Sequence, residues 1–109
     1  MSTEYLPPEE APTREELDRA PGLVLLEFGT SWCGFCQAAA PRVSTLLREY
    51  PHVRHVKVED GPGRPLGRSF RVKLWPSLVF LKDGVVVRQL ARPRDTELKD
   101  AFEALARAE

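Results

Sequence analysis

The chain carries, between residues 23 and 36, the stretch Leu23-Val24-Leu25-Leu26-Glu27-Phe28-Gly29-Thr30-Ser31-Trp32-Cys33-Gly34-Phe35-Cys36. Its first six residues are almost all apolar, which is typical of a β-strand buried on both faces of a sheet. Apolar side chains after Cys33 follow helical spacing, so the sequence predicts a central strand that leads directly into a helix. The only two cysteines of the chain lie at the start of that helix.

The spacing of these two cysteines suits reversible disulfide chemistry. Two cysteines three positions apart at a helix start can close a small disulfide ring. The first also lies where unpaired backbone N–H groups and the helix dipole favour an anion, here a thiolate. We therefore expect Cys33 to attack a disulfide in a partner protein, and Cys36 to resolve the mixed disulfide by forming the Cys33–Cys36 bond.

The composition is that of one domain, expected over residues 1–109. Sixteen basic and sixteen acidic side chains balance, so we expect no affinity for nucleic acid or membrane. We also expect the chain to be a monomer. The acidic N-terminus lacks the apolar core of a signal peptide, and no apolar run approaches membrane-spanning length. A reducing cytoplasm is therefore the expected location, where a Cys-x-x-Cys pair serves redox or metal chemistry rather than bracing the fold.

Periodicity and breaker residues predict the other elements. Residues 1–12 carry three prolines among acidic residues and are expected to be irregular, although residues 3–6 could add a short edge strand. Thr13 and Glu16 form the pattern of a capping box for a short helix that ends before Pro21. Further strands are expected over 53–59, 77–81 and 85–90, and helices over 33–50, 66–70 and 95–108. This order predicts an α/β fold, with a central mixed sheet of four to five strands flanked by helices on both faces.

Several features match, in order, the pattern of one known family. They are Glu27, the motif Trp32-Cys33-Gly34-Phe35-Cys36, Pro41 inside the helix, Lys57, Trp75-Pro76, and the hairpin turn Lys82-Asp83-Gly84. The chain thereby resembles the thioredoxin family over nearly all of its length. The resemblance implies the thioredoxin fold and a thiol–disulfide oxidoreductase that reduces disulfide-containing substrate proteins. It also implies that no cofactor is bound and that electrons come from NADPH through a flavin-dependent thioredoxin reductase.

The resemblance assigns roles to residues outside the cysteine pair. Glu27 would be the buried base that deprotonates Cys36, with Lys57 facing its carboxylate; the alternative is a purely structural ion pair between these two residues. A cis Trp75–Pro76 bond would leave backbone groups free to pair with an extended substrate. The same proline would keep the cysteine pair free of metal.

The substrate-binding surface is expected around the motif. Trp32, Gly34 and Phe35, with Trp75 and Pro76, would form an apolar rim on which partner proteins dock, although core packing is an alternative for Trp32. Seven basic residues could extend this rim towards acidic partners: Arg64, Arg68, Arg71, Lys73, Arg88, Arg92 and Arg94. Solvated charges balanced by the acidic residues are the favoured interpretation of this set.

The chain departs from the family pattern at four places. Phe35 replaces the usual motif proline, and Glu27 is one methylene longer than the family's aspartate. Gly29 stands where many members keep a second tryptophan, and Ala91-Arg92-Pro93 replaces a glycine-containing segment that lines the substrate groove. We expect the fold and the general chemistry to survive these changes, whereas reduction potential and partner choice do not transfer.

Two other functions compete with the redox one. Cys33 and Cys36, followed by His52 and His55, nearly reproduce a zinc-finger spacing. A helix of about fourteen residues would separate the two pairs by roughly 20 Å, which argues against a shared metal. The second rival is a binding or chaperone module that uses the fold without turnover, because an apolar rim serves docking as well as catalysis.

Overall fold

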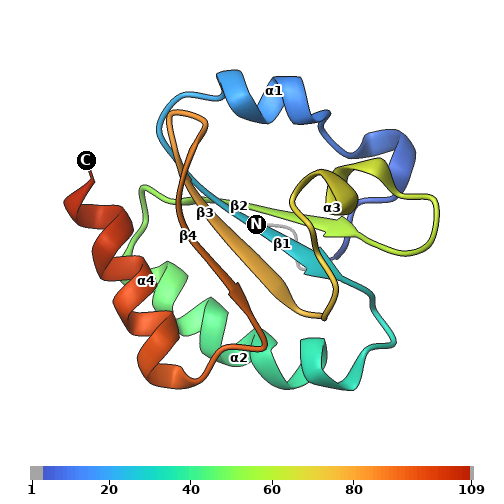
Figure 1. Cartoon of the computed structure of the whole chain (residues 1–109). Helices are drawn as coiled ribbons and strands as arrows, with labels where there is room; N and C mark the ends of the chain where they lie inside the picture. Colours follow the sequence, from blue (N-terminus) through green and yellow to red (C-terminus); the bar gives the residue numbers. More distant parts are fainter. Residues whose placement is uncertain (1–3, 109) are drawn as a thin grey trace.

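A mixed four-stranded sheet forms the centre of the structure, a computed structural model that describes residues 4–108 (Figure 1). The strands are β1 (Leu23–Gly29), β2 (Arg54–Glu59), β3 (Ser77–Lys82) and β4 (Val85–Ala91), in the order β2-β1-β3-β4. β2 runs parallel to β1, whereas β3 is antiparallel to both β1 and β4. The predicted mixed sheet is confirmed.

Helices cover both faces of this sheet, as predicted (Figure 1). They are α1 (Arg14–Arg19), α2 (Gly34–Glu49), α3 (Pro65–Ser69) and α4 (Asp95–Arg107), and a short 3-10 helix, η1, spans Pro8–Glu10. The capping box at the start of α1 is confirmed, because the Thr13 hydroxyl accepts the Glu16 N–H and the Glu16 carboxylate accepts the Thr13 N–H. Within residues 4–108, no helix combines the length and apolar character that crossing a membrane requires.

Every residue of β1 is buried, which confirms the prediction of a strand covered on both faces. Alternate side chains enter two hydrophobic clusters. Leu23 and Leu25 pack with residues of α2 and α4, including Phe102. Leu26 and Phe28 pack on the opposite face with residues of α1 and α3. Because β1 is central and immobilised on both sides, its carboxyl end is a rigid platform for the residues that follow.

The N-terminal segment is tied to the outer edge of β2. Leu6 forms a single parallel bridge with Val58: its N–H donates to the Lys57 carbonyl (2.8 Å), and its carbonyl accepts the Glu59 N–H (2.9 Å). The short edge strand expected over residues 3–6 is therefore represented by a single bridge at Leu6. Thr3 of that expected strand lies outside the described residues. The bridge places Tyr5 beside the carboxyl ends of β1 and β2.

The hairpin between β3 and β4 generates a test of the fold. Gly84 has a φ of +82°, and a Cβ there would overlap the backbone carbonyl of Asp18 in α1. Gly84→Ala should lower the free energy of unfolding by about 2–4 kcal/mol, from left-handed strain plus the clash. Gly22→Ala is the matched control, because Gly22 has a similar φ of +81° but faces open space. It should cost only about 1 kcal/mol. Equal losses in denaturant unfolding would contradict the packing of α1 against the hairpin.

Candidate functional site

Cys33 lies at the junction between β1 and α2. It is the N-cap residue of α2, and its sulfur accepts a hydrogen bond from the Cys36 N–H at 3.2 Å. Both cysteines are free thiols, and Cys33 keeps 8% of its surface exposed. A backbone donor and the positive end of a helix both favour a negative charge on this sulfur. The position therefore suits a nucleophilic thiolate.

Cys36 occupies a different environment, in the first turn of α2 with only 2% of its surface exposed. Burial, followed by the hydrogen bond with the neighbouring Cys33 thiol, raises the pKa of the Cys36 thiol to about 11. Hydrogen bonds with the Thr30 backbone and the Tyr5 hydroxyl lower this pKa in part. Cys36 is therefore protonated at neutral pH, and a base must remove its proton before it can act as a nucleophile.

The carboxyl group of Glu27 is buried in β1, with 2% of the residue exposed. Its Oε2 accepts a hydrogen bond from the Tyr5 hydroxyl at 3.2 Å, and its Oε1 lies 2.8 Å from Nε2 of His55 in β2. A buried carboxyl group needs such polar partners. The sequence identified Glu27 as a site residue, but it did not identify Tyr5 or His55 as partners of its carboxyl group.

Lys57 lies on β2 directly opposite Glu27 in the strand register. Its Nζ is 4.2 Å from the centroid of the Tyr5 ring, a cation–π contact. The Glu27 carboxyl group also lies within hydrogen-bonding distance of His55, on the same strand as Lys57, with Oε1 2.8 Å from Nε2. Lys57 thus enters the site over the face of Tyr5, and its effect on the charge of Glu27 stays a prediction.

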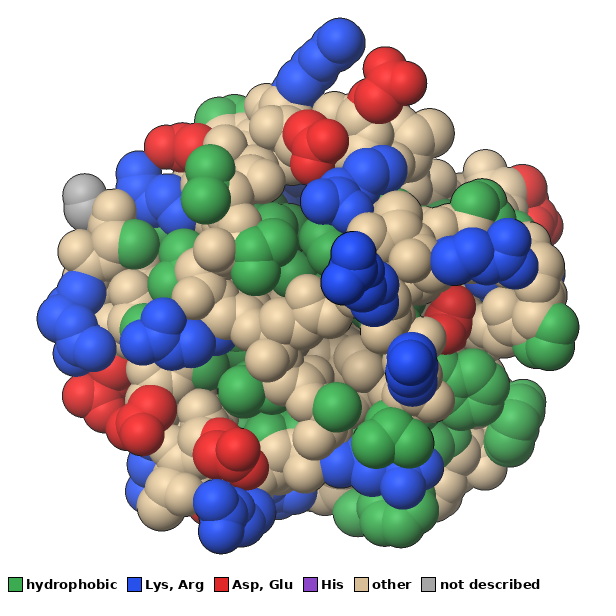
Figure 2. All heavy atoms as spheres, viewed as in Figure 1, with side chains coloured by type: hydrophobic (Ala, Val, Ile, Leu, Met, Phe, Trp, Pro, Cys, Tyr) green, Lys and Arg blue, Asp and Glu red, His purple; other side chains and the backbone are tan. Residues whose placement is uncertain are grey.

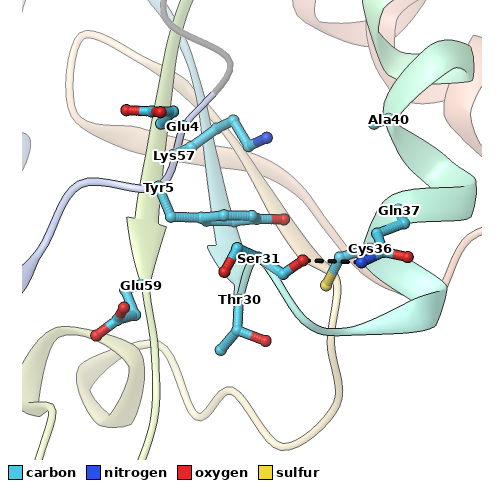
Figure 3. Close-up of a pocket in the computed structure, with 9 residues that line it drawn as sticks. All are labelled: Glu4, Tyr5, Thr30, Ser31, Cys36, Gln37, Ala40, Lys57 and Glu59. Carbon is cyan, nitrogen blue, oxygen red and sulfur yellow. Dashed lines mark hydrogen bonds between the residues drawn. The ribbon is translucent and has the colours of Figure 1, made fainter.

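A pocket of about 420 Å³ lies beside Cys36 (Figure 3). Its lining comes from the N-terminal segment, β2, α2 and the loop before α2: Glu4, Tyr5, Thr30, Ser31, Cys36, Gln37, Ala40, Lys57 and Glu59. The Gln37 amide donates to the Ser31 carbonyl (2.8 Å) and ties that loop to the helix. In Figure 3 the Tyr5 hydroxyl points towards Cys36.

Gly29, the last residue of β1, makes this arrangement possible. A Cβ at this position would lie 2.6 Å from the Cys36 Sγ and 2.7 Å from the Tyr5 oxygen, too close for either atom. The Tyr5 hydroxyl and the Cys36 sulfur therefore occupy the space that a side chain at position 29 would need. This gives a physical reason for glycine at a position where the family often has tryptophan.

Apolar residues around the start of α2 and in the segment before β3 form a surface that we call the aromatic rim: Trp32, Phe35, Leu74, Trp75 and Pro76. Trp32, Phe35 and Leu74 are exposed, whereas Trp75 is partly buried and Pro76 is buried. Trp32 is 73% exposed and Phe35 is 59% exposed. The alternative prediction that Trp32 packs in the core is therefore wrong. Trp32 and Trp75 pack edge to face, with ring centroids 5.7 Å apart. The Trp75–Pro76 bond is cis, as predicted. Gly34 is exposed between the two cysteines.

Leu74 and Arg92 also belong to this surface; the sequence did not assign Leu74 to it, whereas Arg92 is a member of the predicted basic set. Leu74 is 45% exposed and directly precedes Trp75. The Arg92 guanidinium lies 4.0 Å from the centroid of the Phe35 ring, and its Nε donates to the Trp75 carbonyl at 2.8 Å. Arg92 thereby joins the two halves of the aromatic rim.

Only part of the predicted basic set is assembled. Arg64, Arg68, Arg71 and Lys73 line one hollow together with Asp60. Arg88 lies on β4, Arg92 stacks on Phe35, and Arg94 caps α4. In Figure 2, basic and hydrophobic side chains interleave over the side of the molecule where α3 and the start of α2 lie in Figure 1.

The four residues of the zinc alternative do not come together. His55 is paired with Glu27, whereas His52 is exposed in the turn after α2. Among residues 4–108, no group of three or more His, Cys, Asp or Glu side chains is placed to hold a metal ion.

Comparison with known proteins agrees with this geometry. The family model described as Thioredoxin matches residues 8–104. The chain is similar to the structure of reduced thioredoxin 2 from Pseudomonas aeruginosa PAO1, with 55% identity, full coverage of both chains and a TM-score of 0.85. It is 36% identical over 76 residues to an H-type thioredoxin of Fagopyrum esculentum, covering 70% of this chain and 66% of that protein. The chain thus spans about two thirds of the length of this plant relative.

A third similarity is to a chain in the crystal structure of a complex between ferredoxin:thioredoxin reductase and thioredoxin f2. The identity is 28%, the TM-score is 0.70, and the match covers 82% of this chain and 81% of that chain.

The burial of Cys36 leads to a prediction for the variant Cys33→Ser. NMR titration of the Cys36 Cβ chemical shift should give a pKa above the ordinary 9.0, because burial persists when the neighbouring thiol is removed. The same variant unfolded in urea is the control and should titrate at the ordinary value. The folded state keeps the Cys36 proton up to a higher pH than the unfolded state does. The contribution of this shift to the free energy of unfolding is therefore fully present below the unfolded pKa and is lost as the pH rises through the folded pKa. Identical midpoints in the two states would contradict the assignment.

Proposed function

This chain belongs to the thioredoxin family of thiol–disulfide oxidoreductases, and we propose that it works as a protein-disulfide reductase through Cys33 and Cys36. The Cys33 thiolate attacks one sulfur of a disulfide in the partner, and the other partner sulfur leaves as a thiolate. The Cys36 thiol then loses its proton and attacks the Cys33 sulfur. The second partner sulfur leaves, and the Cys33–Cys36 disulfide remains.

The observation that carries this proposal is the inequality of the two thiols. The Cys33 sulfur accepts a hydrogen bond from a backbone N–H at the start of a helix, whereas burial keeps the proton on the Cys36 thiol. An ionised thiol attacks first, and a protonated neighbour stays available for the second step. Two thiols in equal surroundings would have no built-in order of reaction.

Glu27 supplies the base in this proposal. Its carboxyl group is buried on β1 and linked through the Tyr5 hydroxyl towards Cys36. A proton that leaves Cys36 is accepted by this carboxylate and returned later. His55 orients the carboxyl group, and Lys57 adds positive charge above Tyr5.

Partner proteins dock on the aromatic rim. A hollow of about 90 Å³ lies between Phe35 on α2 and Pro76 before β3, and Arg92 closes one side. An apolar side chain of the partner fits this space, while an extended partner segment lies along the backbone beside Pro76. Trp32 and Gly34 border the path by which a disulfide reaches Cys33.

The electron donor in this proposal is a thioredoxin reductase. That a related chain has been solved in complex with ferredoxin:thioredoxin reductase supports a reductase as partner. We place a flavin-dependent, NADPH-fed reductase in this role, so that both cofactors belong to the reductase. A reducing cytoplasm fits a chain whose only cysteines form the redox pair.

Insulin reduction with NADPH and thioredoxin reductase tests the proposal. Cys33→Ser should abolish turnover, because no nucleophile remains to start the exchange. Cys36→Ser is the matched control: it removes one thiol from the same motif but should still form, and then accumulate, the mixed disulfide detectable by mass spectrometry. A pure binding module would give a different result, in which the wild-type chain shows no turnover and Cys33→Ser retains every partner.

A further inference from the structure

We infer that Tyr5 is the proton relay between Cys36 and Glu27, a catalytic role for a residue outside the cysteine motif. The inference rests on the proposed function, because it concerns the step in which Cys36 resolves the mixed disulfide. Its basis is the placement of one hydroxyl between the thiol that must lose a proton and the carboxylate that accepts it.

The Tyr5 hydroxyl donates to the Glu27 Oε2 at 3.2 Å. The same oxygen and the Cys36 Sγ both approach the empty side of Gly29, at 2.7 Å and 2.6 Å from where a Cβ would lie. Glycine at this position thus leaves the phenol and the thiol side by side. Figure 3 shows the hydroxyl of Tyr5 directed at Cys36 across the pocket.

The surroundings hold Tyr5 in this position. The bridge between Leu6 and β2 anchors the adjacent backbone, and the Lys57 ammonium lies over the ring. The charged and titratable groups around the hydroxyl are Glu27 from β1, Lys57 from β2 and Cys36 from α2, while Glu4 and Glu59 line the same pocket. Burial, followed by the charge of Glu27, raises the pKa of Tyr5 far above its ordinary value. The phenol therefore stays protonated and transfers protons without ionising.

The relay moves two protons in one direction. The Cys36 thiol proton passes to the Tyr5 oxygen while the Tyr5 proton passes to Glu27, so that Tyr5 ends as it began. The new Cys36 thiolate forms a bond to the Cys33 sulfur. The bond between Cys33 and the partner sulfur breaks, and the partner sulfur leaves with the electron pair as a thiolate. The disulfide of the substrate is the only oxidant that the step needs.

Ellman's reagent separates the two steps, because each releases one thionitrobenzoate. Attack by Cys33 releases the first equivalent, and resolution by Cys36 releases the second. In Tyr5→Phe at neutral pH the first release should be unchanged and the second should slow by about tenfold, since water in the pocket replaces the hydroxyl only in part. Tyr50→Phe is the matched control, because Tyr50 stacks on Phe102 in the core and both of its phases should equal those of the wild type.

The pH profile distinguishes a relay from a structural effect. The second phase of Tyr5→Phe should accelerate with rising pH and approach the wild-type rate at alkaline pH, as the Cys36 thiol ionises without a relay; the pKa of that thiol is about 11 in the wild type. Slowing of both phases in Tyr5→Phe, or slowing of the second phase that does not depend on pH, would overturn the inference. A second phase of Tyr5→Phe that is as fast as that of the wild type at every pH would overturn it as well. If the wild type releases no second equivalent at all, it is the proposed function that fails.

Two further measurements keep the inference testable should Tyr5→Phe fold poorly. In the wild type, a plot of the second-phase rate against the fraction of heavy water in the solvent should curve downward, as expected when two protons move in one step. A straight line would contradict the relay. Glu27→Gln should slow the second phase, and adding Tyr5→Phe should slow it no further, because both residues serve one path. Additive losses would contradict a shared path.

Discussion

The hydrogen bond from the Cys36 N–H to the Cys33 sulfur is the interaction on which the function of this chain depends. It exists because β1 ends at Gly29 and α2 begins at Gly34, so that Cys33 becomes the N-cap of a sixteen-residue helix. One of the first-turn donors, the Cys36 N–H, then bonds to a sulfur atom instead of water. The same turn directs Cys36 inward, where burial holds its proton.

The sheet supplies the second half of the chemistry. β1 carries Glu27 in its buried centre, β2 carries His55 and Lys57, and the N-terminal segment delivers Tyr5 across the edge of β2. Three parts of the chain thus meet beneath one thiol. The outer surface has the opposite character, because Trp32 and Phe35 remain exposed around the nucleophile and can dock partners.

The elements that sequence reasoning predicted well are those governed by local patterns. The apolar run of β1, the cysteine pair at the start of α2 and the hairpin turn at Asp83-Gly84 each depend on neighbouring residues, and the structure confirms them. The partners of Glu27 could not be found in this way. Tyr5 and His55 are 22 and 28 positions away from Glu27, and nothing in their own segments indicates a buried contact. Gly29 and the Leu6 bridge explain the arrangement only once the backbone is known.

The reactivity of Cys33 is the most direct test of this account. The measurement is the rate of iodoacetamide alkylation of Cys36→Ser, in which Cys33 is the only thiol, beside free cysteine across a range of pH. Cys33 should react faster than free cysteine at neutral pH, and this advantage should vanish at alkaline pH, where both thiols are ionised. A rate at neutral pH no higher than that of free cysteine would contradict it.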